Sequence, residues 1–137
     1  MYRFETVFNV KILVDPVAKG RPRFTRAGRC YTPAATKHYE VQLKEALNRA
    51  WGLPVIEDTP LRLEILFHVK RPQKKRDYPT TRPDTDNLLK AVMDAMNGVI
   101  VKDDALFCDI EAKKRYAEFE PFIELTIFRL DSIYREG

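Results

Sequence analysis

The segment LRLEILFHV, residues 61–69, has an apolar side chain at every odd position. The polar residues Arg62, Glu64 and His68 fall at even positions. Successive side chains of a β-strand point to opposite faces of the sheet. A period of two therefore predicts a strand with one face buried in the core and the other more polar.

Three other segments have the pattern of a strand. Residues 2–14 alternate and are expected to form a half-buried strand. Its expected inner face consists of Phe4, Thr6, Phe8, Val10 and Ile12. Residues 106–117 and 121–130 predict two more strands. In the second of these, Ile123, Leu125 and Ile127 share one face.

Two segments predict helices. Thr32 and Pro33 suit the start of a helix that runs to Trp51 and ends at Gly52. Residues 86–97 predict a second helix that stops at Gly98. On a helical wheel, Leu88, Leu89, Val92, Met93 and Met96 fall on one face, which is the expected core face.

The predicted order is strand, helix, strand, helix, strand, strand. This order gives an α+β fold in which a small mixed sheet packs against two helices on one face. Residues 15–32 are expected to form a long loop or a loose hairpin, because they contain Pro16, Gly20, Pro22 and Gly28. Residues 71–83 form a second long loop. Loops of this length inside a compact domain are usually functional.

The composition fits one domain over residues 1–137, with 45% hydrophobic residues to build a core. Cys30 and Cys108 lie far apart without the spacing of a zinc site or a disulfide framework. No stretch approaches the roughly 18 apolar residues of a membrane span. We therefore expect a soluble, cytoplasmic protein with no membrane partner and no small-molecule cofactor.

Positive charge is concentrated in two segments, 19–29 and 71–82, each with five Lys or Arg residues. Both segments precede a predicted helix. Basic side chains of this kind neutralise DNA phosphates. The residues predicted to bind DNA are Lys19, Arg21, Arg23, Arg26, Arg29, Lys74, Lys75, Arg76 and Arg82.

Two carboxylates stand at the start of the second predicted helix, in the stretch PDTDNLLKAVMDAM of residues 83–96. Asp84 should be extended or in a turn, because it lies near a proline and precedes the helix. Asp86 should lie in the first turn, so both acids sit near the positive end of the helix dipole. One explanation is structural: Asp86 caps the helix and Asp84 is solvated.

The other explanation is a metal site. Mg²⁺ is held by a few carboxylates together with substrate phosphates and water. A third acid is available in the turn at Asp103 and Asp104, which can return the chain to the same edge of the sheet, although aspartate is also common in plain turns. Acids beside two basic loops are the combination that a metal-dependent nuclease needs.

At these residues the chain resembles a known family. Over residues 16–116 it resembles the RusA-type Holliday junction resolvases. The segments that carry the resemblance are PDTDNLLKAVMDAMNGVIVKDD, GRPRFTRAGRCYTP with the following TKHYE, and the later Lys113-Lys114. The resemblance implies a RusA-like fold and a homodimeric, Mg²⁺-dependent endodeoxyribonuclease, with Mn²⁺ as a possible substitute. It implies symmetric nicking of four-way DNA junctions in recombination and repair.

The resemblance also implies roles for single residues. Asp84, Asp86 and Asp104 would be the metal-binding carboxylates, and Lys90 the catalytic lysine. Since paired nicks require two sites, an isologous homodimer is expected. Its interface is expected on the sheet face opposite the helices, where Phe122, Phe128 or Val7 would lie.

Two alternatives stay open. Pro83-Asp84 with Glu111 and Lys113 fits the PD...ExK pattern of restriction-type nucleases, although that short pattern arises easily by chance. The chain could also be a non-catalytic DNA-binding protein that uses the two basic loops. Magnesium dependence separates this second alternative from a nuclease.

Some residues suggest no chemistry of their own. His38 and His68 are too far apart in sequence to suggest a ligand pair, so we expect surface or packing roles. Phe24, Tyr31 and Tyr78 are expected to anchor loops to the core, with stacking on exposed bases as the alternative.

Overall fold

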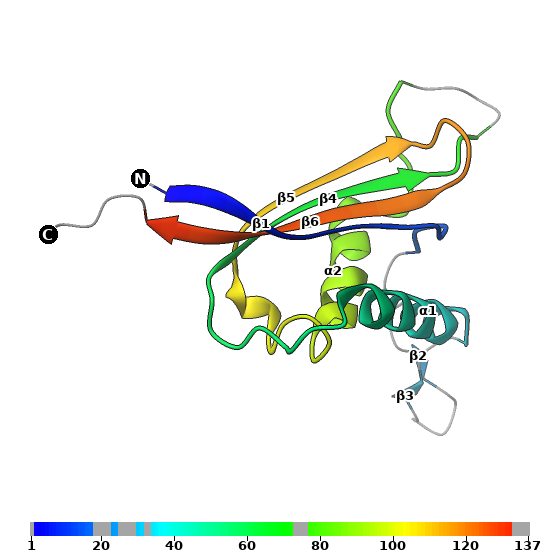
Figure 1. Cartoon of the computed structure of the whole chain (residues 1–137). Coiled ribbons are helices and arrows are strands. Elements are labelled where there is room, and N and C mark those ends of the chain that lie inside the picture. Colours follow the sequence, from blue (N-terminus) through cyan, green and yellow to red (C-terminus); the bar gives the residue numbers. More distant parts are fainter. Residues whose placement is uncertain (1, 18–22, 25–29, 32–33, 73–76, 133–137) are drawn as a thin grey trace, which may run out of the picture.

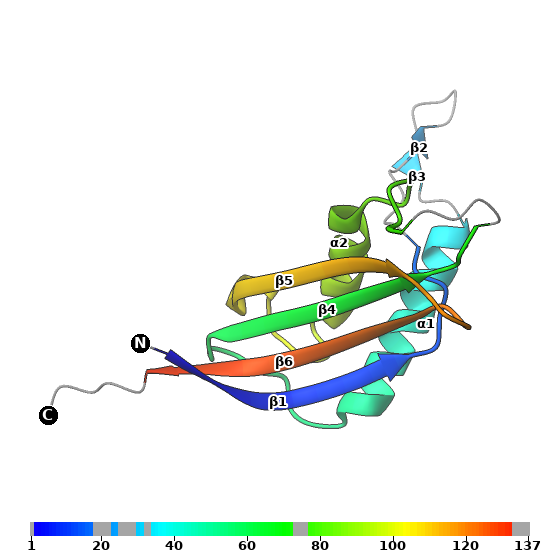
Figure 2. The same ribbon diagram turned by 90° about the horizontal axis from the view of Figure 1, so that it is seen from above.

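The structure of the chain is a computed structural model that describes residues 2–17, 23–24, 30–31, 34–72 and 77–132. Four strands form one sheet: β1 (Tyr2–Ile12), β4 (Leu61–Val69), β5 (Phe107–Tyr116) and β6 (Phe122–Ser132). Their spatial order is β1-β6-β4-β5. β4 and β5 are parallel, and the other neighbouring pairs are antiparallel, as Figure 2 shows. The fold is α+β with a mixed sheet, as the sequence predicts.

Two helices lie on one face of this sheet: α1 (Ala34–Trp51) and α2 (Thr85–Met96), as Figure 1 shows. Between β1 and α1, β2 (Arg23–Phe24) and β3 (Cys30–Tyr31) pair as a short antiparallel hairpin. A single 3₁₀ turn, η1 (Asp104–Leu106), leads into β5. None of the helices in the described ranges is long and apolar enough to span a membrane.

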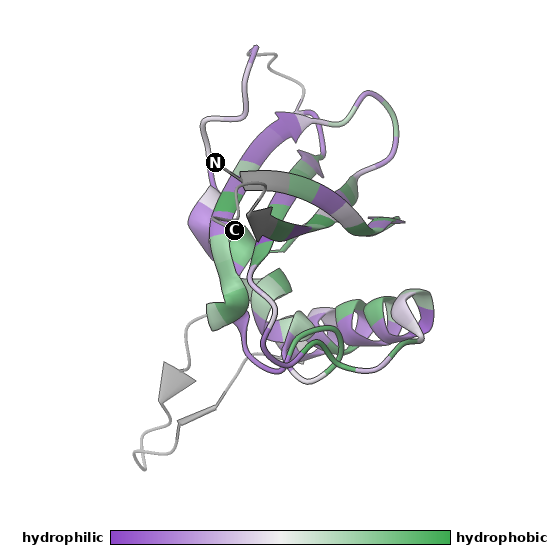
Figure 3. Cartoon of the chain, turned by 60° about the vertical axis from the view of Figure 1, so that its left-hand side comes forward, coloured by the Kyte–Doolittle hydropathy of each residue, from purple (hydrophilic) through white to green (hydrophobic). Residues whose placement is uncertain are grey.

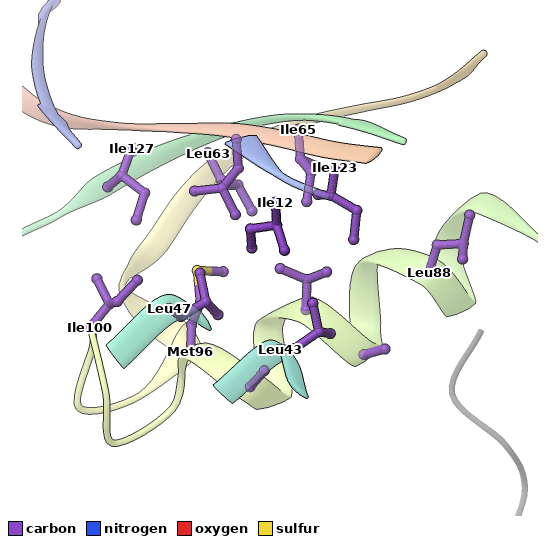
Figure 4. Close-up of a cluster of buried hydrophobic side chains, with 14 of the residues drawn as sticks. Ile12, Leu43, Leu47, Leu63, Ile65, Leu88, Met96, Ile100, Ile123 and Ile127 are labelled. Atoms are coloured by element: carbon purple, nitrogen blue, oxygen red, sulfur yellow. The ribbon is translucent and has the colours of Figure 1, made fainter. Parts of the chain in front are cut away.

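The core fills the space between the sheet and the helices. The strands contribute the buried side chains of Ile12, Leu63, Ile65, Ile123 and Ile127 (Figure 4). The helices and the turn after α2 contribute those of Leu43, Leu47, Leu88, Met96 and Ile100. The odd-numbered residues of β4 are all buried, and the even-numbered ones are partly exposed. The strict alternation of LRLEILFHV therefore predicted this strand and its buried face correctly.

Both predicted helices are confirmed to within about one residue. Gly52 (φ 59°) and Gly98 (φ 79°) adopt the left-handed conformation after α1 and α2, which is the usual reason for glycine at a helix end. On α2 the buried side chains are Leu88, Ala91, Val92, Ala95 and Met96. Along α1, hydrophobic and hydrophilic residues alternate (Figure 3), as expected for a helix with one face on the core.

The predicted single inner face of β1 is wrong in the first half of the strand. A register shift between Thr6 and Phe8 interrupts the pairing of β1 with β6. An extra residue in a strand reverses the faces that follow it. Phe8 therefore packs edge-on against Trp51 on the helical side. Phe4 is instead 52% exposed and contacts Phe128, with ring centroids 6.0 Å apart.

Candidate functional site

The N-terminus of α2 presents two exposed carboxylates, those of Asp84 and Asp86, which we call the acidic pair. Asp84 is the N-cap residue and is extended (φ −73°, ψ 143°), which is the usual backbone conformation of an N-cap. Its carbonyl accepts the first helical hydrogen bond from the N–H of Leu88 at 3.0 Å. Its side chain makes no capping hydrogen bond.

This geometry corrects one part of the structural explanation of the acidic pair, namely that Asp86 caps the helix. The cap position belongs to Asp84 and not to Asp86, and the carboxylate of Asp84 does not cap. Both acids lie close to the unpaired N–H groups of the first turn, where the helix dipole favours negative charge. The side chains of the pair are therefore left available to bind an external group.

Lys90 lies one turn after Asp86 on the exposed side of α2. The opposite side of the helix is held in the core by Leu88 and Val92, both fully buried. This packing fixes the rotation of α2 about its axis. Lys90 and Asp86 are therefore directed outward on neighbouring turns of one polar stripe.

Asp104 does not join the acidic pair within one chain. A carboxylate oxygen of Asp104 lies 3.5 Å from the side-chain nitrogen of Asn97, the C-cap residue of α2. At 1.5 Å per residue, about 16 Å of helix axis separates Asp86 from Asn97. Over the described residues, no group of three His, Cys, Asp or Glu side chains is placed to hold one metal ion.

The expectation that the turn after α2 brings Asp104 to the same edge as the acidic pair is thus wrong for the single chain. The physical reason is the backbone hydrogen bonding of this turn. The N–H of Lys102 donates to the carbonyl of Ile56 at 2.8 Å, and that of Ile56 donates to Ile100 at 2.8 Å. These bonds hold the turn at the C-terminal end of α2, from which η1 leads directly into β5 (Figure 1). Asp103 caps η1 by accepting from the N–H of Ala105 at 2.9 Å.

One residue near the site, Lys114, contributed to the resemblance in the sequence but was given no role there. The side-chain nitrogen of Lys114, in β5, lies 2.8 Å from the carbonyl oxygen of Thr81 and 2.8 Å from that of Pro83. Pro83 immediately precedes the acidic pair. The sequence signal for Lys114 was the period of two in β5. This period places a lysine on the same, helix-facing side of the strand as Ala112 and Tyr116.

A pocket of about 330 Å³ lies beside this segment. Its wall includes three basic side chains, those of Lys70, Arg82 and Lys114, and one acidic side chain, that of Asp15, so the basic side chains are in excess. The wall is formed partly by the segment that enters α2 and partly by the end of β5, two parts of the chain that lie near each other in Figure 2. Positive charge therefore borders the acidic pair, as a site that binds a phosphate through a metal ion requires.

Comparison with known proteins identifies the family of the chain. A sequence model of one family, Endodeoxyribonuclease RusA, matches residues 14–128. The chain belongs to the RusA family. The match contains the acidic pair, Lys90, Asp104 and Lys114, and it extends beyond the resemblance seen in the sequence motifs. A protein of Bacillus subtilis (strain 168) named "Uncharacterized protein YqaN" is 35% identical over 128 residues, which cover 82% of this chain and 89% of that protein.

RusA family nucleases act on DNA and are metal-dependent, so the basic residues are of direct interest. Among the predicted DNA-binding residues, Arg82 is exposed beside the acidic pair. The backbone of Arg23 is in β2. Seven of the predicted residues lie outside the described part of the chain: Lys19, Arg21, Arg26, Arg29, Lys74, Lys75 and Arg76.

The PD...ExK alternative does not fit the structure. Glu111 and Lys113 do share a strand face, and their side chains form an ion pair of 3.2 Å. Glu111 also contacts Arg62 at 3.0 Å. Arg62 is on the face of β4 that points away from the helices, so Glu111 lies on the opposite face of the sheet from α2. The RusA-type acidic pair is therefore the better candidate for the site.

The histidines and Tyr78 have no part in this site. His38 is exposed on α1, whereas His68 stacks on Phe122 with ring centroids 4.0 Å apart. Burial lowers the pKa of His68, which favours a neutral packing role. Tyr78 is 58% exposed, with the guanidinium of Arg115 5.0 Å from its ring centre, so it does not anchor its loop to the core as expected. The side chains of Phe24 and Tyr31 lie outside the described part.

Proposed function

We propose that this chain is a Mg²⁺-dependent endodeoxyribonuclease that resolves four-way DNA junctions by paired, symmetric nicks, in recombination or repair. The observation that carries the proposal is the acidic pair: two exposed carboxylates at the start of α2, without a capping role, in a member of the RusA family. The basic residues that border the pair support a DNA substrate.

The residues present fit a magnesium ion. Asp84 and Asp86 offer hard oxygen donors at a helix N-terminus, and Mg²⁺ in nucleases is held by one or two carboxylates plus phosphate oxygens and water. When bound, the ion supplies positive charge that offsets the charge developing on the phosphate oxygens. Mn²⁺ prefers similar ligands and is expected to substitute.

Lys90 and Arg82 are assigned the two positive roles of the site. Lys90 is directed outward one turn from Asp86, where its ammonium can stabilise the added negative charge of the transition state. Arg82 is exposed two residues before Asp84, where its guanidinium can bind a neighbouring phosphate in bidentate fashion. Arg82 therefore binds the DNA strand, and Lys90 stabilises the negative charge at the scissile phosphate.

The proposed enzyme is a homodimer, because two nicks on strands of like polarity require two sites related by a two-fold axis. The position of Asp104 supports a particular arrangement. Since Asp104 lies at the far end of α2 from its own acidic pair, it can complete a three-carboxylate site only for the pair of a partner chain. We therefore assign Asp104 to the metal site of the second copy.

The outer edge of β5 suits this assembly. β5 is an edge strand, and its Ile110 is 41% exposed. Asp104 precedes the start of β5, and Lys114 near its end reaches the segment before Asp84. Two such edges in antiparallel register would bring Asp104 of each chain close to the acidic pair of the other. On the face opposite the helices, Phe128 already packs on Phe4, and Phe122 on His68.

The test uses a synthetic four-way junction and a linear duplex of the same sequence, each with and without Mg²⁺. We expect symmetric nicks on the junction only, and only with the metal. Binding to both DNAs without cleavage under every metal condition would instead identify a DNA-binding protein. Light scattering at micromolar concentration should give twice the chain mass of 16.0 kDa.

A further inference from the structure

We infer that Lys114 is a positioning residue for the proposed nuclease reaction: it fixes the backbone that presents Asp84, and so sets the metal affinity of the acidic pair. This inference rests on the proposed function for the metal site at the acidic pair and for its catalytic readout. Its structural basis is the pair of hydrogen bonds from one ammonium group to Thr81 and Pro83, 33 and 31 residues away in the chain.

The location of Lys114 is unusual for a lysine. In β5 it pairs with Phe67, a fully buried residue of β4, and it points to the helical side of the sheet. Its side chain is only partly exposed. Lysine at such a position loses hydration and rotamer freedom, and these costs are offset when its N–H groups find acceptors. Two of its three donors are used by carbonyls of the segment that enters α2.

The acceptors explain what the interaction does. Thr81 and Pro83 belong to an irregular segment, and Pro83 has no N–H with which to join a regular hydrogen-bond pattern. The bonds from Lys114 therefore attach this segment to the rigid sheet. Asp84 follows Pro83 directly, so the direction of its carboxylate depends on the same backbone. Outer residues that orient metal ligands commonly change affinity or activity by about 10- to 100-fold when replaced.

Charge alone would act in the opposite direction. An ammonium close to two carboxylates repels a cation, so its removal should tighten metal binding if electrostatics were its only influence. Loss of positioning should weaken metal binding. The sign of the change in metal affinity therefore distinguishes the two roles, and it can be measured without DNA or catalysis.

The neighbouring Lys113 provides a matched control. It is one residue away in the same strand, has the same charge, and is on the opposite face of the sheet, paired with Glu111 at 3.2 Å. Lys114→Met removes the donors and keeps most of the side-chain length. Lys113→Met makes the same chemical change without touching the segment that enters α2.

The experiment measures Mn²⁺ affinity of the full chain by calorimetry, and separately kcat and KM on a four-way junction. We expect Lys114→Met to weaken Mn²⁺ binding and to lower kcat, each by about 10- to 100-fold, with a smaller change in KM because Arg82 and Lys90 are unaltered. Lys113→Met should match the unaltered chain in every measurement.

Unchanged or tighter Mn²⁺ binding by folded Lys114→Met would overturn the inference. If that variant does not fold, as judged by circular dichroism, Lys114→Gln keeps donors without the charge and should retain more Mn²⁺ affinity than Lys114→Ala. Equal affinities of these two variants would also overturn it. Failure of the unaltered chain to cleave the junction would reject the proposed function, while the Mn²⁺ measurements would still decide the role of Lys114.

Discussion

The side-chain nitrogen of Asn97 lies 3.5 Å from a carboxylate oxygen of Asp104, so the third acid of the RusA-type motif is held at the C-terminal end of α2. The other two acids are at the N-terminal end of the same helix. A helix is too stiff to bring its two ends together. Three acids can meet at one metal ion only if two chains contribute to each site.

This geometry predicts complementation between two inactive variants. In a heterodimer of one Asp86→Asn chain and one Asp104→Asn chain, one site should keep all three acids and the other should lose two. We expect such a heterodimer, isolated with two different affinity tags, to nick one junction strand, although each homodimer is inactive. Denaturing gels with each strand labelled in turn measure this outcome.

A second heterodimer serves as the control. Asp84→Asn in one chain and Asp86→Asn in the other should leave both sites incomplete, because these two acids come from the same chain. No cleavage is therefore expected. If the first heterodimer is also inactive while the unaltered protein cleaves, the shared arrangement of Asp104 is disproved.

Replacement of Asp86 by Asn should separate binding from cleavage. The change removes a metal ligand but also removes negative charge near the DNA phosphates. We expect junction cleavage to fall by about 10²- to 10³-fold or more, the order seen when a charge-stabilising group is removed, while junction affinity stays equal or increases. Gel-shift titration in Ca²⁺ or EDTA and a cleavage assay in Mg²⁺ measure the two effects. Asp58→Asn, at an exposed position outside the site, should change neither.

Replacement of Arg82 by Ala should weaken DNA binding in a salt-dependent way. Arg82 is exposed beside the acidic pair and lines the pocket that also contains Lys70 and Lys114. Loss of one phosphate contact should reduce the slope of log affinity against log salt by about 0.9. Fluorescence anisotropy between about 50 and 200 mM salt measures this slope. Arg49→Ala, at an exposed position near the end of α1, is the control; an equal slope for both variants would argue against a phosphate contact at Arg82.

Replacement of Leu88 by Ala tests how firmly the core holds the helix of the site. Leu88 is fully buried in the first half of α2. We expect the free energy of unfolding to fall by about 2–5 kcal/mol, since the change removes a buried side chain and leaves a cavity. Denaturant unfolding followed by circular dichroism measures it. Leu53→Ala, at a position 61% exposed, should cost less than about 0.5 kcal/mol, and comparable losses would contradict the packing described for α2.

The sequence by itself determined the main helices and strands of this protein and its membership of the RusA family. The alternation in 61–69 predicted β4 and its buried face, and the spacing of Leu88, Val92 and Met96 predicted the buried face of α2. The position of Asp84 just before a predicted helix predicted its non-helical conformation. These predictions succeeded because each depends on the geometry of a few consecutive residues, which the local sequence determines.

Tertiary structure alone decided which distant residues meet. The shift between Thr6 and Phe8 that turns Phe4 away from the helices depends on pairing with β6, more than a hundred residues later. The hydrogen bonds of Ile56 with Ile100 and Lys102 hold Asp104 at the far end of α2. The parallel pairing of β5 with β4 brings Lys114 to Pro83. Such contacts follow from strand order and packing, which the period of a single segment does not encode.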